Sequence, residues 1–599
     1  MRFLNYCVLF IFLFLQVNCK KEDNKTTELF LLFAILNYLQ NQSTVASSCS
    51  TTGVPSDPLY TNQWHLNNDG TTSGAVSGED VNANSAWEKG CKGNGVNIVT
   101  VDDGMDYTHE DLKSNYDNSL NITYSSSGES GLFNYSNCST TGLGCHGTAV
   151  SGIMSARDSN GIGLSGIAPR SKIGARNVLV NSTDSNASSA MSQNSTKVWV
   201  SNNSWGAADN TGRLASSGSL WQSGVNSGFT SGRNGKGTIY FWAAGNGGQL
   251  LTSSNTSGIV SSGTATRDNS NHDGQANFYN TFAVAAIGND GKRAYYSEEG
   301  ANLLITAHSQ GLSGGPAIAT TDIASSGGYN TTGASPNFSN TNYTNSFNGT
   351  SASSPLAAGV GALILERNSN LTSRDVRVIL ARAARKNDST DSDWVTNGAG
   401  LNFNHKYGFG AVHVGNALTL ADSWTLIGSL LTSTQTGSTT NSNIPNNNQT
   451  GALNSATLSN TGIGKIEFVE VTMTVQTGTN DDAGDLYVEL ISPAGTKARL
   501  AVPRICTSNG SIAFCNDFTA WTFGATTFVD ESANGTWQLR VADVCTKAVG
   551  GAGTSNYTCD ATSRYTQTGS SFVYSTSKNI ANLDHTLSSW SIRVRGRAN

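Results

Sequence analysis

Three polar residues, each in a short segment that contains a glycine, have the types that nucleophilic acyl transfer uses: Asp102, His146 and Ser351. A serine hydroxyl is a poor nucleophile at neutral pH and needs an imidazole to take its proton. The imidazole in turn needs a carboxylate that fixes its tautomer and stabilises its charged form. We therefore treat these residues as a candidate catalytic triad, with Ser351 attacking, His146 moving protons and Asp102 orienting His146.

The chain order of the three residues, Asp then His then Ser, narrows the class of enzyme. Chymotrypsin has the histidine first and α/β-hydrolases have the serine first, whereas subtilisin has this order. Each motif alone is a weak signal, because a chain with 65 glycines contains many such tripeptides that are only turns. The prediction of a subtilisin-type serine protease therefore depends on the segments around them.

Those segments have the character of elements that could position the three side chains. Residues 97–101 are apolar and mostly β-branched, as in a buried parallel strand that delivers Asp102 at its carboxyl end. Small and apolar residues after His146 predict a helix, and residues 355–365 predict a helix buried on nearly all sides. A serine at a helix start lies beside free backbone N–H groups and the positive end of the dipole.

A fourth element supplies a candidate for stabilising the oxyanion. Residues 238–244 read as another strand, and it ends in a Gly-Asn-Gly-Gly segment that contains Asn246. A donor aimed at the developing negative charge is worth about 3–4 kcal/mol, and the Asn246 amide with the Ser351 N–H forms a natural pair. The alternative is a simple loop that adopts positive φ angles.

Several of these segments resemble the kexin/furin-like proprotein convertases, a branch of the subtilisin-like proteases. The resemblance covers residues 55–425 as a peptidase domain and 445–599 as a P domain. It implies an α/β fold, with a central parallel sheet and helices on both faces, followed by an all-β, jelly-roll-like sandwich. The segments that carry it are Asp102-Asp103-Gly104, His109-Glu110-Asp111-Leu112, Ser204-Trp205-Gly206, Trp242-Ala243-Ala244-Gly245-Asn246-Gly247-Gly248 and the Gly-Thr-Ser segment that continues to Gly359.

The resemblance implies an acidic pocket for the residue before the cleaved bond. Asp209 and Asp273 match its two carboxylates, near Trp205 and Gly206, and Asp103 matches a carboxylate that faces the next substrate position. Such a pocket accepts Arg or Lys, because a guanidinium gains charge-assisted hydrogen bonds there. Two other acidic positions of the family are absent, so we expect a weaker demand for a multibasic motif. Solvated loop aspartates are the alternative interpretation.

Calcium is the cofactor that the resemblance implies. A structural site is matched by side chains and by carbonyl groups from one loop, and calcium prefers such oxygen ligands. A second site lies near Asp209 and Glu298, where an insertion between Gly248 and His272 leaves the third ligand unassigned. The matched residues of the first site are the side chains of Asp57, Asp111 and Asn160 and the carbonyls of Arg157, Ile162 and Leu164.

The N-terminal residues predict export. Residues 1–18 read as a signal peptide, and Cys19 directly after the apolar run resembles a relaxed bacterial lipoprotein signal that would place a lipid anchor there. Residues 19–54 form a polar tether with a short apolar stretch at 28–40, too short to span a membrane. A plain secretory signal is the alternative. Between Cys19 and Asp57 the chain is too short for the prodomain usual in subtilases.

The cysteine count agrees with an exported protein. Ten cysteines are present; without Cys7 in the signal and Cys19 at its end, an even set of eight remains, which predicts disulfides although eight cysteines allow 105 pairings. Proximity in the sequence favours the pairs Cys138–Cys145, Cys506–Cys515, Cys545–Cys559 and Cys49–Cys91.

A change of composition marks the start of the second domain. Residues 426–444 are polar and low in complexity, which predicts a linker. Beyond them Val469, Val471, Met473 and Val475 alternate with other residues, as in a half-buried strand, and similar runs follow to the C-terminus. We therefore expect a β-sandwich over 445–599.

Composition restricts the partners. The formal net charge is −6 and only 13% of residues are charged, so no basic surface for nucleic acid is expected. We predict a monomeric, calcium-supported endopeptidase that acts on proteins or peptides. It is exported, and it is either secreted or anchored by a lipid at a bacterial membrane or cell surface, such as the outer membrane. The alternative is a surface binding lipoprotein whose sandwich recognises a partner and whose peptidase domain is vestigial.

Overall fold

The computed structural model describes residues 49–122, 144–257, 259–324, 326–438, 441–477, 483–508, 511–513, 515, 517–548, 555–576 and 583–599. The predicted signal peptide, Cys19, the apolar stretch at 28–40 and Cys138 lie outside these residues. Among the helices of the described ranges, none combines the length and the apolar character needed to cross a membrane.

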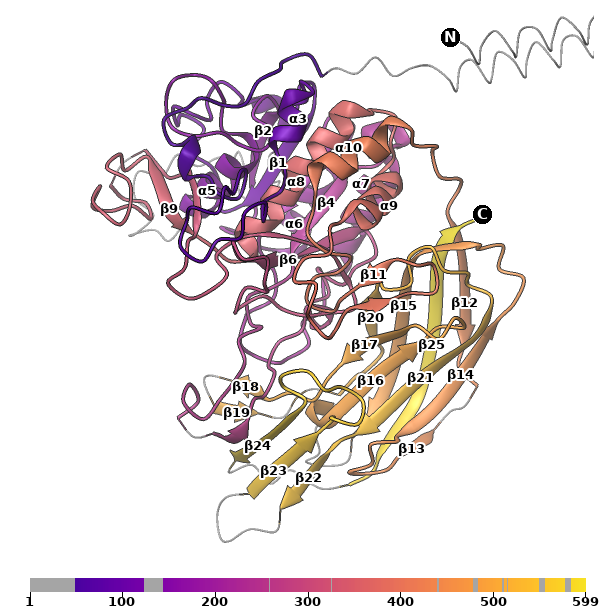
Figure 1. Cartoon of the computed structure of the whole chain (residues 1–599). Helices are drawn as coiled ribbons and strands as arrows, with labels where there is room; N and C mark the ends of the chain where they lie inside the picture. Colours follow the sequence, from indigo (N-terminus) through magenta and orange to yellow (C-terminus); the bar gives the residue numbers. More distant parts are fainter. Residues whose placement is uncertain are drawn as a thin grey trace, which may run out of the picture. The chain divides into compact units, whose positions relative to one another are not determined.

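A six-stranded, all-parallel sheet forms the centre of the first domain (Figure 1). Its order is β2-β1-β3-β4-β6-β7. Strands β4, β6 and β7 are mainly apolar because both faces of the sheet are covered, and β1 is buried from Ile98 to Asp102. The bounds are β1 Asn97–Asp102, β2 Lys172–Asn177, β3 Val200–Asn203, β4 Ile239–Ala243, β6 Thr281–Ile287 and β7 Leu303–His308.

Helices pack against this sheet in pairs. Helices α5 (Cys145–Ser155) and α8 (Thr350–Arg367) contact each other, and α8 contacts β3, β4, β6 and β7. As the sequence predicts, α8 is buried along nearly its whole length. A second pair consists of α6 (Asp184–Ser192) and α7 (Ser219–Gly235). The remaining helices are α3 Asn84–Glu88, α9 Ser373–Ala383, α10 Val414–Asp422 and the short 3-10 helices η1 Tyr60–Asn62, η2 Asn118–Leu120, η3 Ser270–His272 and η4 Ala483–Asp485.

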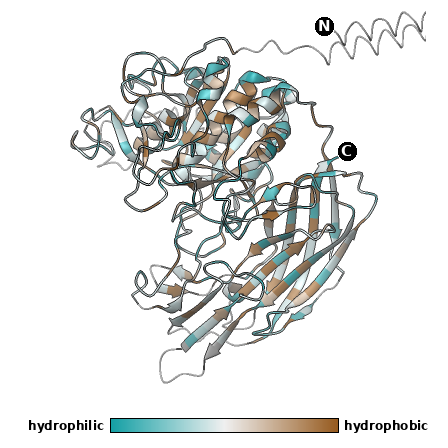
Figure 2. Cartoon of the chain, viewed as in Figure 1, coloured by the Kyte–Doolittle hydropathy of each residue, from teal (hydrophilic) through white to brown (hydrophobic). Residues whose placement is uncertain are grey.

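Two antiparallel sheets form the second domain, in agreement with the predicted β-sandwich. One has the order β12-β25-β15-β20 with β13 also on β25, and the other has the order β14-β21-β16-β17. Their inward residues form a separate apolar core, which contains the alternating residues of β15. Figure 2 shows apolar residues in the strands of both domains. The bounds are β12 Leu431–Thr436, β13 Ser442–Ile444, β14 Ala452–Leu458, β15 Lys465–Gln476, β16 Leu486–Ile491, β17 Lys497–Ala501, β20 Trp521–Ala525, β21 Gly535–Asp543 and β25 His585–Arg597.

Strands β12 and β13 lie inside the segment 426–444 that composition marks as a linker. Both pair antiparallel with β25, so this segment is part of the sandwich. Thr and Ser at an exposed edge strand give a polar, low-complexity pattern because such a strand buries little apolar surface, although Thr itself favours strands.

The insertion between Gly248 and His272 extends a sheet of the second domain. Its strand β5 (Val260–Gly263) pairs antiparallel with β24 (Ser571–Thr576), next to β23 (Ser555–Asp560) and β22 (Cys545–Ala548). The first and second domains therefore share a sheet. Three further hairpins have the bounds β8 Ile318–Thr321 with β9 Tyr343–Phe347, β10 Val395–Thr396 with β11 Asn402–Phe403, and β18 Cys506–Ser508 with β19 Ser511–Ala513.

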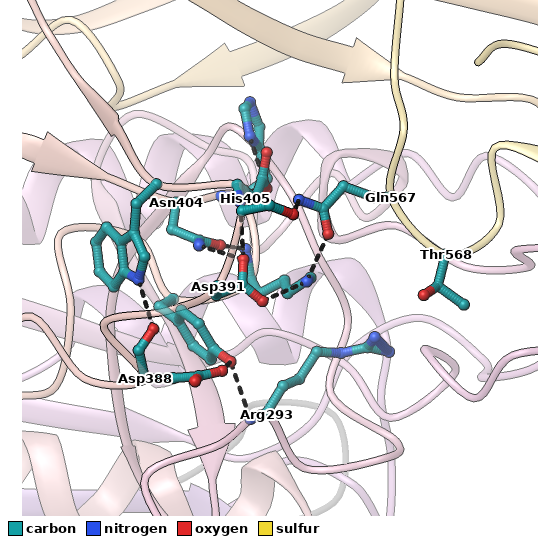
Figure 3. A network of polar contacts seen from close by, with 12 residues as sticks. Arg293, Asp388, Asp391, Asn404, His405, Gln567 and Thr568 are labelled. Carbon is teal, nitrogen blue, oxygen red and sulfur yellow. Dashed lines mark hydrogen bonds and ion pairs between the residues drawn. The ribbon is translucent and has the colours of Figure 1, made fainter.

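Buried polar contacts join the two domains. The Arg499 guanidinium of β17 donates to both oxygens of Asp393 at 2.5 and 2.7 Å, and the Arg499 N–H donates to Nε2 of His405 at 2.9 Å. Nearby, Lys406 Nζ contacts Asp391 at 2.6 Å and donates to Gln567 at 2.7 Å, in the network drawn in Figure 3. Because these groups are withdrawn from water, each charge depends on its partner.

Three of the four predicted disulfides are confirmed. The bonds Cys49–Cys91, Cys506–Cys515 and Cys545–Cys559 are present. The fourth predicted pair includes Cys138, which lies outside the described residues.

Candidate active site

Three of the candidate catalytic residues come from the carboxyl ends of strands or the first turns of helices. Asp102 ends β1, His146 lies in the first turn of α5, and Ser351 lies in the first turn of α8. Asn246 follows β4 by three residues. In open parallel sheets, ligands bind at the carboxyl edge, where such residues meet.

Asp102 and His146 form a direct contact. His146 Nδ1 lies 2.8 Å from Asp102 Oδ1, which also accepts the Asp103 N–H at 2.8 Å. Asp102 is fully buried, whereas the His146 side chain is 27% exposed. Burial disfavours the imidazolium, but the charge and hydrogen bond of Asp102, with a further contribution from the Asp103 charge, raise the pKa of His146 to about 9.

Ser351 lies beside this pair with its hydroxyl held by the backbone. Its Oγ donates to the Ser204 carbonyl at 3.3 Å, and the Ser204 hydroxyl donates to the Ser351 carbonyl at 3.1 Å. Ser351 and His146 line one cavity together with Asn246. In enzymes without substrate, hydrogen bonds between nucleophile and base are often long or absent and form in the complex.

Asn246 lies in the same cavity as Ser351, and its side chain is held by hydrogen bonds to Thr350 and Asp209. Its Oδ1 accepts the Thr350 N–H at 2.7 Å and the Thr350 hydroxyl at 2.9 Å. Gly245 next to it has φ +109°, and a Cβ there would come within 2.3 Å of Glu298. This close approach explains why the strand is followed by glycine.

Asp103, which the resemblance assigns to the next substrate position, is held at the start of α5. Its two oxygens accept the N–H groups of Gly147 and Gly144, each at 2.8 Å, at the start of α5. Only 4% of Asp103 is exposed, and burial followed by the Asp102 charge raises its pKa. Asp103 therefore caps the helix that carries His146.

An acidic cavity of about 250 Å³ adjoins Ser351 and Asn246. Asp273 lies in its wall and accepts the Ala207 N–H at 2.8 Å and the Gln275 N–H at 2.7 Å. Gly206 borders it, where a Cβ would come within 2.5 Å of the Asp273 carboxylate. Trp205 and Asp209 also line it. The structure thus brings together Asp209, Asp273, Trp205 and Gly206, as the resemblance implies.

At the predicted first calcium site, two carboxylates from different parts of the chain contact the loop 157–164. Asp57 accepts the backbone N–H groups of Ser159 at 2.7 Å and Asn160 at 3.0 Å. Asp111 accepts the backbone N–H of Leu164 at 2.9 Å and the side-chain amide N–H of Asn160 at 2.6 Å. Burial, with a contribution from the Asp57 charge, raises the pKa of Asp111 to about 7. Within the part of the chain that the structure describes, neither carboxylate forms an ion pair. This uncompensated negative charge fits a hard cation, although the Asn160 amide presents its nitrogen to Asp111.

A third carboxylate, missed by the sequence analysis, completes the second cluster. Carboxylate oxygens of Asp209, Asp268 and Glu298 lie within 4.8 Å of one another. Asp268 also accepts the N–H groups of Asn210, Thr211 and Gly212. Burial, then the charges of Asp268 and Asp209, raise the pKa of Glu298 well above its ordinary value. Asp268 lies only five residues before Asp273 in the sequence, and this position is the signal that could have identified it.

A parallel sheet that presents Asp, His and Ser in this order at its carboxyl edge, followed by a β-sandwich, defines a subtilisin-like protein. The chain matches the Subtilase family over residues 93–410 and the proprotein convertase P-domain family over residues 466–554. This chain therefore belongs to the subtilase family and carries a P domain.

Known relatives agree with this assignment. The chain is 31% identical over 501 residues to the "PC3-like endoprotease variant B" of Hydra vulgaris, covering 82% of this chain and 64% of that protein. It is 32% identical to human neuroendocrine convertase 2, covering 82% and 71%. The crystal structure of a serine protease of Aeromonas sobria matches with a TM-score of 0.75 and 26% identity, covering 92% of this chain and 97% of that one. The chain thus spans somewhat less than two thirds of the Hydra relative.

Proposed function

We propose that this protein is a serine endopeptidase that cleaves peptide bonds after Arg or Lys. The observation that carries the proposal is one continuous site: the Asp102–His146 contact and Ser351 adjoin a cavity walled by the buried carboxylate of Asp273. A vestigial binding protein, the alternative drawn from the sequence, would have no need of this arrangement.

In the proposed reaction, Ser351 Oγ attacks the peptide carbonyl while His146 takes its proton. Asp102 holds Nδ1 of His146, so the other ring nitrogen acts as the base and later returns the proton to the leaving amine. The Asn246 amide and the Ser351 N–H stabilise the oxyanion. A water then attacks the acyl-enzyme, and Ser351 is regenerated.

The acidic cavity supplies the proposed preference for a basic side chain. Asp273 is nearly buried and receives backbone N–H groups, and Asp209 lies closer to solvent, so an incoming guanidinium or ammonium meets one desolvated and one exposed carboxylate. Charge-assisted hydrogen bonds in such a pocket discriminate strongly against neutral side chains.

Calcium is proposed as a structural cofactor at both carboxylate clusters. Asp57, Asp111 and Asn160, with the carbonyls of their loop, would hold one ion, and Asp209, Asp268 and Glu298 would hold a second. A bound ion would compensate the negative charge of each cluster. We also propose export, because the disulfides require an oxidising compartment and residues 1–19 resemble a signal.

The proposal is tested by comparing the wild-type protein with the Ser351→Ala variant. The probes are a fluorophosphonate, which labels only an activated serine, and two peptides that differ by Arg or its neutral isostere citrulline before the cleaved bond. We expect labelling and cleavage by the wild-type protein only, and a preference for Arg of about 10²-fold, because one charge would otherwise remain unpaired.

Ser223→Ala, in the exposed face of α7, is the matched control and should be labelled like the wild-type protein. Labelling of Ser351→Ala would refute the assignment of the nucleophile. Equal cleavage of the two peptides would refute the acidic-pocket assignment alone.

A further inference from the structure

A second cavity of about 530 Å³ adjoins the candidate catalytic residues. It shares Ser351, Asn246 and Asp209 with the acidic cavity, but Asp273 and Trp205 line only the acidic one. Its remaining wall combines four aromatic side chains, Tyr295, Tyr296, Tyr329 and Phe347, with the polar residues Asn210, Gln249, Ser346 and Asn348.

The position of His146 indicates which part of a substrate this cavity would receive. In acyl transfer the histidine donates its proton to the leaving amine, so the leaving residue departs on the histidine side of the serine. His146 lines the aromatic cavity and not the acidic one. If the acidic cavity holds the residue before the cleaved bond, the aromatic cavity faces the residue after it.

Two of the aromatic rings form a connected row beside His146. The Phe347 ring packs edge-on against the His146 ring at 5.4 Å between centroids, and Tyr329 follows at 5.7 Å from Phe347. Tyr329 is 43% exposed and Tyr295 is 39% exposed. Large aromatic surface left open to solvent beside a reactive site is typical of a binding surface.

Buried hydrogen bonds anchor the loop that carries Tyr329. The buried Asp322 carboxylate accepts the N–H groups of Ile323 at 2.9 Å and Asn330 at 2.7 Å. A Cβ on Gly328 would come within 2.0 Å of that carboxylate, so the loop depends on glycine there. The buried Asn330 side chain donates to the carbonyl groups of Tyr343 and Phe338, each at 2.8 Å.

We propose that Tyr329, with Phe347 and Tyr295, selects an aromatic or large aliphatic side chain in the residue that follows the cleaved bond. This inference rests on the proposed peptidase function and names its substrate class more closely. An apolar side chain would cover the exposed rings, and a wall that is already anchored loses little conformational entropy when it is covered. The charges of Asp102 and Asp103, which act on Tyr329, and the Asp209 carboxylate, which lines the cavity, oppose an acidic residue there.

The test uses internally quenched peptides that share one sequence up to a central Arg and differ only in the next residue. That residue is Phe, Leu, Gly, Asp or Lys, and kcat/KM is measured for each. For the wild-type protein we expect Phe and Leu peptides to be cleaved about ten-fold faster than the Gly peptide, with Asp the slowest, as hydrophobic subsites discriminate by this order. Tyr329→Ala should reduce the Phe-to-Gly ratio several-fold, whereas Tyr329→Phe should retain it.

The exposed Leu453→Ala variant in β14 is the control and should retain the wild-type ratio. The inference is overturned if the wild-type protein cleaves the Lys or Gly peptide as fast as the Phe peptide. It is also overturned if the Phe-to-Gly ratio of kcat/KM is unchanged in Tyr329→Ala. An arginyl coumarin amide, which has no residue after the cleaved bond, separates the two proposals. If the wild-type protein fails to hydrolyse it, the proposed function fails as well.

Discussion

At the scale of single residues, Asp103 connects the proposed catalytic pair, Asp102 and His146, to helix α5. Its carboxylate receives two N–H groups at the start of α5, and its charge is one of the influences that raise the pKa of His146. His146 acts as a base only when it is neutral. The rate should therefore rise with pH as His146 loses its proton, with a midpoint above the ordinary histidine value of about 6.5.

Asp103→Asn should shift that midpoint to lower pH by about one unit, because loss of the negative charge makes the imidazolium less stable. The variant should also be less stable by about 1 kcal/mol, since an amide cannot accept both N–H groups through oxygen. The measurement is the pH profile of kcat/KM on an arginyl peptide, together with thermal unfolding. The exposed Asp69→Asn is the control. An acid limb at the same pH as in the wild-type protein would contradict the prediction.

At the scale of elements, loops rather than strands or helices hold the proposed calcium sites. The segment 157–164 wraps around Asp57 and Asp111, and the segment 209–212 is fixed by Asp268. Hydrogen bonds to these carboxylates hold the loops, and bound ions would pin them further. The second segment also borders the acidic cavity.

Removal of calcium with a chelator should lower the thermal unfolding midpoint, because an ion that binds only the folded state stabilises it by about 2.7 kcal/mol at a hundred-fold excess over Kd. Asp111→Asn should lower the midpoint in calcium and make it less sensitive to the chelator. Asp117→Asn, which alters only the N-cap of η2, should retain the wild-type sensitivity. The same midpoint with and without calcium in the wild-type protein would exclude the proposed structural role.

At the scale of the whole molecule, the P domain is joined to the peptidase domain by a shared sheet and by buried ion pairs. Strand β5 of the peptidase domain pairs with β24, and Arg499 of β17 bonds Asp393. Arg374 of α9 also forms a two-pronged contact with the buried Glu467 of β15, at 2.6 and 2.8 Å. We therefore expect the two domains to unfold together.

Arg499→Ala should reduce the free energy of unfolding by about 3–5 kcal/mol, because it removes the guanidinium that pairs with both oxygens of the buried Asp393 carboxylate. Lys497→Ala, on the same strand but with a side chain that is 57% exposed, is the matched control and should change the stability by less than about 1 kcal/mol. Calorimetry of both variants provides the measurement. Equal unfolding temperatures for the two variants would show that the Arg499 contact does not hold the domains together.

Local patterns in the sequence predicted much of the fold and the centre of the site. A strand that ends at Asp102 and a helix that starts at Ser351 are encoded by consecutive residues, because periodicity and helix starts depend on near neighbours. For the same reason the alternation in β15 predicted the sandwich, and short separations predicted the disulfides within it. The resemblance to a known family then added Asp209 and Asp273.

Contacts between distant segments could not be read in this way, and the tertiary structure alone decided them. Examples are Asp268 beside Glu298, Arg499 beside Asp393, and Tyr329 beside the ring of Phe347. The Ser and Thr of β12 gave no strand signal because an exposed edge strand has no apolar face, and only its pairing with β25 defines it. Composition and periodicity record what each segment buries, whereas the partner that covers it is set by the packing of the whole chain.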